Sequence, residues 1–208
     1  MSKVQVDKSH YLTLNYLSKR RWNSYWYQIN EIYQLKPKKI LEIGTGGGVV
    51  SNQLKKMGFL VTTVDFDQSL KPDIVGDVRK LPFKNDFFDL VLCAQVLEHL
   101  PFRYFKKSLS ELNRVTNKYV ILTLPHFSIT ELYFGLKLIP YVPKIEKTVK
   151  IDWPIKHKFL GEHYWEIGRE DYMLNKIKSL IKKSGFSIEK CFYPVENPKH
   201  QFFILKKI

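Results

Sequence analysis

The feature that most constrains the fold is "KKILEIGTGGGVV", residues 38–50, where four glycines occupy five positions directly after an apolar run. Glycine weakens strands and helices, because it loses more conformational freedom on ordering than any other residue. A glycine cluster at the end of a buried strand therefore indicates that something large and polar approaches the backbone closely.

The segments around the glycines alternate between two patterns. The runs "KKILEI", "FLVTTVDF", "FDLVLCAQ" and "KYVILTLP" are apolar or β-branched and predict strands, with "DIVGDV" as a further short strand. Residues 11–35, 47–58, 101–116 and 169–185 have helical spacing. Alternation of this kind predicts right-handed crossovers and a mainly parallel α/β sheet.

Composition narrows the class of protein. The chain is 44% hydrophobic and 26% charged, which is typical of a folded domain, and its net charge is +14. The basic residues are spread along the chain, which favours a lysine-rich solvated surface, while a nucleic-acid or anionic-membrane partner remains open.

Three further features concern the compartment. Cys93 and Cys191 are the two cysteines, and their positions match neither a disulfide framework nor a metal-ligand spacing. The start "MSKVQVDKSHY" has no apolar signal-peptide core, and no run of about 18 apolar residues exists. The sequence therefore predicts a cytoplasmic, reducing location.

The alternation of predicted strands and helices is interrupted at residues 126–170. We interpret residues 1–36 as an N-terminal helical cap and residues 37–208 as the main domain, with an insertion at 126–170. Within the insertion, "ELYFGLKLIPYVPK" mixes apolar bulk with lysines; we expect burial against the domain, with peripheral membrane contact as the alternative. "FSIEKCFYPV" and "HQFFILKKI" predict a terminal pair of strands, one of them antiparallel.

The glycine spacing separates two classes of ligand. A dinucleotide fingerprint requires G-x-G-x-x-G, but counting from Gly44 places Val49 at the third position. The pattern is instead E-x-G-x-G-x-G, formed by Glu42, Gly44, Gly46 and Gly48. A strand that leads through it into a helix start predicts a cradle for a polar ligand.

Two acids follow at strand ends. Asp65 ends the second strand, where a carboxylate can accept both hydroxyls of a ribose. Asp77 ends the third strand and can accept from the amino group of a base, while the backbone of Val78 can bond a ring nitrogen. Each acid alone is also explained as a turn residue.

In order, "ILEIGTGGG", "VDFD", "GDVRKLPF" and "FDLVLCAQVLEHL" resemble the successive motifs of class I S-adenosylmethionine-dependent methyltransferases, most of all a small bacterial, type-11-like group. The resemblance implies a Rossmann-like, seven-stranded, mostly parallel sheet with helices on both faces and a reversed final strand. It also implies S-adenosyl-L-methionine as the cofactor.

The resemblance assigns site residues by position. Gly44, Gly46 and Gly48 would border the methionine and ribose, and Asp65 would hold the ribose hydroxyls. Around the adenine and the methyl group it places Phe66, Asp77, Ala94 and Gln95. One departure concerns the 12 residues from Asp65 to Asp77, which are too few for the family's usual crossover helix and predict that this helix is lost or reduced to a turn.

An oxygen or nitrogen acceptor can require a general base, and histidine suits neutral pH. Of His99, His126, His157 and His163, we expect His126 and His163 to be the best candidates, since the first follows the fifth strand and the second lies among aromatics. Glu166 is a lesser option. The spacing from His157 to His163 suits no common zinc pattern, so the sequence predicts no metal site.

The acceptor is the least determined part. We expect an aromatic-rich lid, formed by the N-terminal helices and the insertion, over a small-molecule or saccharide acceptor that is O- or N-methylated. An RNA methyltransferase that uses the basic surface and a non-catalytic cofactor-binding subunit remain alternatives. The oligomeric state is not indicated.

Overall fold

The computed structural model describes residues 7–136, 145–153, 155–159 and 161–208. Its centre is a seven-stranded sheet in the order β3-β2-β1-β4-β5-β9-β8. The strands are β1 (Lys39–Ile43), β2 (Leu60–Asp65), β3 (Ile74–Val75), β4 (Phe88–Ala94), β5 (Thr116–Pro125), β8 (Phe186–Phe192) and β9 (His200–Lys207).

All neighbouring strands from β3 to β5 pair in parallel, whereas β9 runs antiparallel to both β5 and β8. The mostly parallel, Rossmann-like sheet with a reversed final strand is therefore confirmed, as is the terminal strand pair. The order changes direction between β1 and β4, so the carboxyl ends of these two strands flank the point where open α/β sheets bind ligands.

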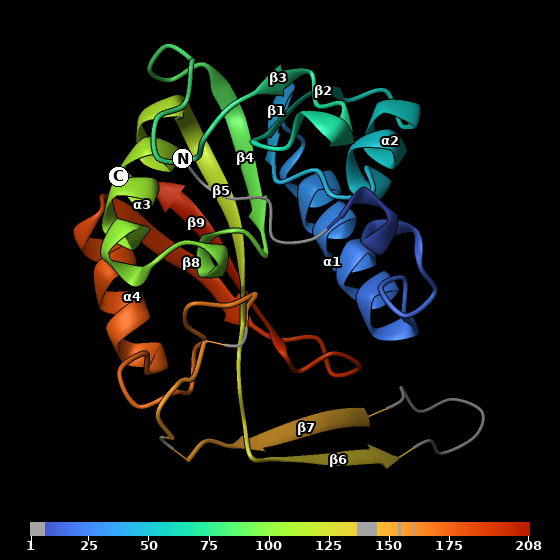
Figure 1. The fold of residues 1–208 in the computed structure, drawn as a ribbon, viewed down its shortest axis with the longest axis vertical. Coiled ribbons are helices and arrows are strands. Elements are labelled where there is room, and N and C mark those ends of the chain that lie inside the picture. Colours follow the sequence, from blue (N-terminus) through green and yellow to red (C-terminus); the bar gives the residue numbers. More distant parts are fainter. Residues whose placement is uncertain (1–6, 137–144, 154, 160) are drawn as a thin grey trace.

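Helices cover both faces of this sheet (Figure 1). On one face lie α1 (Lys19–Leu35) and α2 (Val49–Lys56), and on the other α3 (Phe105–Val115) and α4 (Leu174–Lys183). Each face has its own core: Ile32 and Leu54 pack with one side of the central strands, and Leu109 and Ile181 pack with the other. Central strands buried on both faces explain why their sequences are continuously apolar.

Short 3-10 helices make the remaining connections. They are η1 (Lys8–Leu12), η2 (Gln68–Leu70), η3 (Leu97–His99) and η4 (Phe102–Tyr104). The single turn η2 stands between β2 and β3, which confirms that the usual crossover helix is reduced. None of the helices in the described part of the chain combines the length and apolar character that crossing a bilayer requires.

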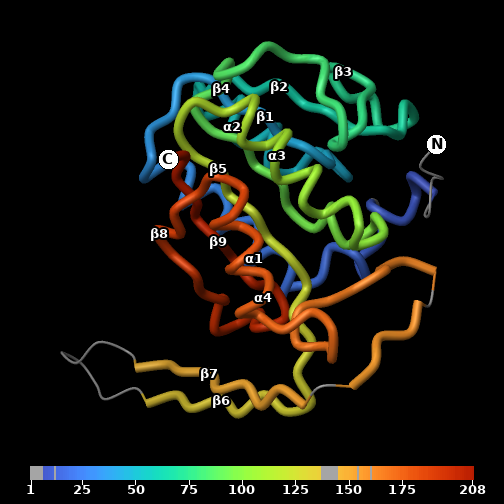
Figure 2. The backbone as a smooth tube through the Cα atoms, turned by 90° about the vertical axis from the view of Figure 1, so that its left-hand side faces the viewer, coloured from blue at the N-terminus to red at the C-terminus, as the bar shows by residue number. Residues whose placement is uncertain are grey.

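The insertion contains a regular element that its sequence did not reveal. Strands β6 (Thr130–Leu136) and β7 (Ile145–Ile151) pair antiparallel in a separate ribbon beyond the ends of the main sheet (Figures 1 and 2). Burial was expected for "ELYFGLKLIPYVPK", and for its described part this was wrong: Phe134 and Leu136 are 60% and 53% exposed. Residues 137–144 of that stretch, like residues 1–6, lie outside the described residues.

Candidate active site

The glycine segment forms a turn that only glycine adopts without strain. Gly44, Gly46 and Gly48 have φ angles of 79°, 48° and 70°, in the left-handed region, and Gly48 is the N-cap of α2. A Cβ on residue 44 would lie 2.3 Å from Val96 Cγ2, and one on residue 46 would lie 3.3 Å from Tyr11 Cδ1. The glycines therefore serve both backbone conformation and close packing.

This turn opens into a cavity of about 1080 Å³ at the carboxyl ends of the strands. Gly48 apart, every site residue predicted from the sequence lines it: Glu42, Gly44, Gly46, Asp65, Phe66, Asp77, Val78, Ala94, Gln95, His126 and His163. Gly48 lines a smaller neighbouring hollow of about 300 Å³. Residues from positions 42 to 163 of the sequence are thus brought to one site, although their individual roles stay predictions.

Asp65 is fixed in place by the glycine turn. Its Oδ2 accepts a hydrogen bond from Thr45 N at 2.9 Å and its Oδ1 accepts one from Asp67 N at 3.0 Å. Burial raises the pKa of Asp65, and these hydrogen bonds oppose the rise. The carboxylate is therefore held against the cavity wall with lone pairs remaining for a ligand's hydroxyls.

We expect Asp65→Ala to weaken S-adenosylmethionine binding by about 1–3 kcal/mol, because the ribose hydroxyls would lose their acceptor in a partly buried site. Isothermal titration calorimetry measures this directly. Asp171→Ala removes an exposed acid outside the cavity lining and serves as the control. Unchanged affinity in Asp65→Ala would remove this carboxylate from the cofactor site.

Glu42 lies under the turn with 4% of its surface exposed, and its Oε2 has no hydrogen-bond partner. Burial raises the pKa of Glu42 from 4.5 to about 7, although hydrogen bonds with Ser51 lower it. A carboxyl group with a pKa near neutrality changes charge within the physiological range.

Glu42→Gln should flatten the dependence of stability on pH. The folded chain binds more protons than the unfolded chain between pH 4.5 and about 7, so the free energy of unfolding falls as pH rises through this window. Between about pH 5.5 and about pH 8 the loss in wild type is about 2 kcal/mol. Urea titrations at both pH values measure it, with the exposed Glu170→Gln as control. An unaltered slope in Glu42→Gln would contradict the assignment.

Asp77 lines the cavity, but its carboxylate oxygens are already engaged. Its carboxylate forms a bidentate ion pair with the Arg79 guanidinium and accepts a hydrogen bond from Arg79 N at 2.8 Å. A base amino group that reached Asp77 would share its oxygens with this arginine. The sequence did not single out Arg79.

The two predicted bases have different surroundings. His126 is 4% exposed, with Nδ1 at 3.0 Å from Gln201 Oε1 and Nε2 at 2.9 Å from Asp152 Oδ2. Gln201 donates its own amide hydrogens elsewhere, to Phe192 O at 2.8 Å, so its Oε1 accepts from His126. Both ring nitrogens of His126 are engaged, which speaks against this residue as a base.

His163 is better placed for proton transfer or ligand binding. Its Nδ1 lies 2.9 Å from Glu166 Oε1, and the pKa of Glu166 is lowered by that hydrogen bond, so Glu166 is the charged acceptor. Burial lowers the pKa of His163, but the bond to Glu166 and the charge of Glu98 outweigh it and raise the pKa above its ordinary value. Glu166 thereby orients the His163 ring, and its role as a base stays a prediction.

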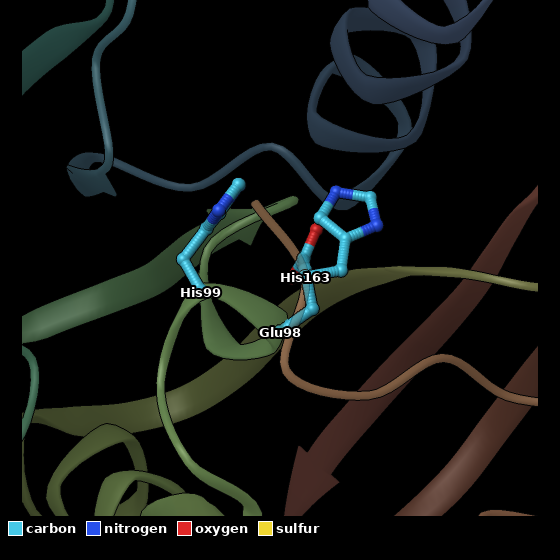
Figure 3. A group of neighbouring side chains, drawn as sticks. All are labelled: Glu98, His99 and His163. Carbon is cyan, nitrogen blue, oxygen red and sulfur yellow. The ribbon is translucent and has the colours of Figure 1, made fainter. Parts of the chain in front are cut away.

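A cluster of Glu98, His99 and His163 joins the fourth-strand motif to the insertion (Figure 3). One ligating atom from each residue lies within 4.8 Å of the others. Glu98 and His99 belong to η3, whereas His163 belongs to a loop 64 residues further along the chain, counted from His99 (163 − 99 = 64). Sequence spacing did not indicate this set, because only the fold brings the two segments together.

The N-terminal segment supplies residues to the cavity wall. Tyr11, Tyr16, Arg21 and Tyr25 line the cavity, and the Arg21 guanidinium lies 3.9 Å over the Tyr16 ring. By contrast, Trp22 and Trp26 are more than half exposed, and Trp165 is fully buried in the core beside Phe105. Aromatic residues expected in one lid therefore divide between cavity, surface and core.

Comparison with known proteins shows what the site-bearing segment is similar to. The model of the family described as "Methyltransferase domain" matches residues 41–123, which include the glycine turn, Asp65, Asp77 and Gln95. Residues 41–123 are therefore similar to a methyltransferase domain. The match agrees with the recognition made from the sequence motifs, and solved structures of this fold were crystallised with S-adenosylmethionine or S-adenosylhomocysteine bound.

Relatives of the methyltransferase domain include enzymes of ubiquinone biosynthesis. The ubiquinone biosynthesis O-methyltransferase of Coxiella burnetii is 33% identical over 88 residues, covering 35% of this chain and 37% of that protein. The mitochondrial enzyme of that name from Schizosaccharomyces pombe is 31% identical over 157 residues, covering 62% and 56%. The chain thus spans only about 37% of the length of the Coxiella relative and 56% of the yeast one.

Solved structures share the fold of the methyltransferase domain. Magnesium protoporphyrin IX methyltransferase from Synechocystis, with bound S-adenosylhomocysteine, has a TM-score of 0.64 at 14% identity and covers 91% of this chain and 84% of its own. The 1,6-didemethyltoxoflavin-N1-methyltransferase of Burkholderia thailandensis has a TM-score of 0.61 at 13% identity, covering 96% and 86%. At these identities the likeness establishes the fold.

Proposed function

We propose that this chain transfers a methyl group from S-adenosylmethionine to a hydroxyl or amine of a small molecule or saccharide. The observation that carries the proposal is one cavity of about 1080 Å³, lined by the cofactor-motif residues on one side and by His99 and His163 on the other. This volume is at the upper end of the range for ligand pockets, which suits a cofactor and an acceptor together.

The cofactor supplies an activated methyl group when bound. The glycine turn and Asp65 would hold its nucleoside end. The residues of this chain then have to align the acceptor with the methyl carbon and exclude water. Removal of the acceptor's proton takes place at the Glu98–His99–His163 cluster, with Glu166 orienting His163 through its hydrogen bond.

The N-terminal segment completes the site in this proposal. The acceptor-side walls are provided by residues 1–36, which were expected to form a helical cap, and by the insertion at 126–170. This role is supported by Tyr11 and Tyr25 from the N-terminal segment and His163 from the insertion, since all three line the cavity. Relatives support a small acceptor: one is named for ubiquinone biosynthesis, and another was crystallised with bound 1,6-didemethyltoxoflavin.

The test is transfer of label to an endogenous acceptor. Purified protein is incubated with cell extract and S-adenosylmethionine labelled in the methyl group, and the labelled fraction is identified by chromatography and mass spectrometry. Label in a low-molecular-weight or saccharide fraction is expected. Label in RNA alone would contradict the acceptor class, and binding of S-adenosylhomocysteine without any labelled product would favour a non-catalytic subunit.

A further inference from the structure

We propose that Glu98, His99 and His163 bind a divalent transition-metal ion, with Zn²⁺ as the reference ion, at the acceptor side of the cavity. The inference rests on the proposed function for the use of the ion, but the site itself is argued from three observations. These are a buried carboxylate oxygen without a partner, two histidines fixed in the orientation of metal ligands, and hydrogen bonds that hold the two chain segments together.

The first observation is Glu98. Its side chain is 0% exposed, and its Oε2 has no hydrogen-bond partner. With the Gln95 amide turned so that both of its polar atoms are satisfied, Gln95 donates to the other oxygen, Oε1, at 3.3 Å. An unpaired buried carboxylate oxygen is costly. A bound cation would satisfy this oxygen.

The second observation is the orientation of the histidines. His99 Nδ1 lies 3.1 Å from the carbonyl oxygen of Glu162, and His163 Nδ1 lies 2.9 Å from the Glu166 carboxylate. A carbonyl or carboxylate oxygen only accepts, so each Nδ1 carries the hydrogen and, in the neutral ring, Nε2 carries the lone pair. Metal-binding histidines in proteins almost always have such an outer partner on the second nitrogen.

The third observation is the attachment of the insertion loop to η3. Tyr164 N donates to Glu98 O at 2.8 Å, and Trp165 Nε1 donates to Leu100 O at 3.1 Å. Together with the contact of His99 and Glu162, these bonds hold His163 beside Glu98, as Figure 3 shows. The ligating atoms lie within 4.8 Å of one another, and closing the set onto one ion requires side-chain rotations, because the ligands of tetrahedral zinc lie roughly 3.3–3.6 Å apart.

The chemistry of the set selects the class of ion. Two imidazoles and one carboxylate are ligands of Zn²⁺ and similar first-row ions, whereas Mg²⁺ prefers oxygen ligands alone. Three protein ligands leave a position open toward the cavity that His99 and His163 line. The ion, rather than an unassisted His163, would then activate the acceptor.

In that position the ion would bind an acceptor hydroxyl and lower its pKa, so that the proton passes to water. The oxygen then forms its bond to the methyl carbon while the carbon–sulfur bond breaks, and the electron pair of that bond remains on sulfur as S-adenosylhomocysteine leaves. The site therefore favours oxygen over nitrogen as the atom that is methylated.

The test titrates ZnCl₂ into EDTA-treated full-length protein by calorimetry and records the visible absorption of Co²⁺ in the same site. We expect one ion to bind per chain. Zn²⁺ affinity should fall in Glu98→Gln and in His163→Gln by more than about 10–100-fold, which is the loss typical of removing a residue that only hydrogen-bonds to a metal ligand. His10→Gln removes a cavity histidine outside the cluster and should bind as wild type. MgCl₂ should not compete.

Affinity for S-adenosylhomocysteine, measured in every variant, separates the two proposals. If wild type binds S-adenosylhomocysteine but takes up no Zn²⁺, or if Glu98→Gln binds Zn²⁺ as tightly as wild type, the metal site is overturned while the methyltransferase proposal stands. The metal site is supported, whatever the acceptor is, if Glu98→Gln and His163→Gln lose Zn²⁺ and Co²⁺ binding but retain affinity for S-adenosylhomocysteine.

Discussion

His163→Gln should lower the rate of methyl transfer by about 10²–10⁴-fold, the contribution typical of general acid–base catalysis. The loss is expected whether His163 takes the proton itself or holds an ion that activates the acceptor, because both require its Nε2 lone pair. The measurement is the initial rate of label transfer to the acceptor fraction of cell extract, at saturating S-adenosylmethionine.

The same variant should keep its affinity for S-adenosylhomocysteine, since His163 lies on the acceptor side and not beside Asp65. Its thermal unfolding should also stay close to wild type, because His163 is only partly buried. A variant that folds, binds S-adenosylhomocysteine and turns over at the wild-type rate would exclude His163 from the reaction. Loss of cofactor binding together with turnover would instead place it in the cofactor site.

Gly46→Val should reduce S-adenosylmethionine affinity by more than about 100-fold. A β-branched residue at a φ of 48° is strained by roughly 1–3 kcal/mol, and its added carbons meet the Tyr11 ring, which lies 3.3 Å from the position of the Cβ alone. Overpacking of this kind costs about 1–3 kcal/mol more. The two effects together cost about 2–6 kcal/mol, a range that includes the about 2.8 kcal/mol of a 100-fold loss, because about 1.4 kcal/mol is a factor of ten. Calorimetric titration with S-adenosylmethionine measures it.

Gly47 provides a matched control in the same turn. It does not have a positive φ, and a Cβ there would lie 3.5 Å from Tyr11 O, an ordinary contact. Gly47→Ala should therefore bind the cofactor far more nearly as wild type does than Gly46→Ala. Equal S-adenosylmethionine affinity of the two alanine variants would contradict the interpretation of this turn as the cofactor-binding segment.

Much of the fold could be predicted because its signals are local. Continuous apolar runs identify strands buried on both faces, and the 12 residues between Asp65 and Asp77 are too few for a full crossover helix, as η2 confirms. The glycine turn and the strand-end acids converge in space because parallel strands present their carboxyl ends at one edge. The candidate cofactor wall thus follows from topology once the strands are recognised.

The acceptor side could not be predicted in the same way, because its contacts join distant segments. His163 meets Glu98 through hydrogen bonds of the loop backbone, which have no signature in spacing. The ion pair between Arg79 and Asp77 depends on the conformation of the arginine side chain, which the sequence does not indicate. The ribbon of β6 and β7 exposes apolar residues that sequence reasoning would place in a core.

The packing of Val96 beside Gly44 has a consequence for substitutions in the glycine turn. Val96 fills the space beside Gly44, lines the cavity, and is the N-cap of η3, two positions before Glu98. A side chain added at position 44 would displace Val96 and with it the start of η3, so a change on the cofactor side would also disturb the acceptor side.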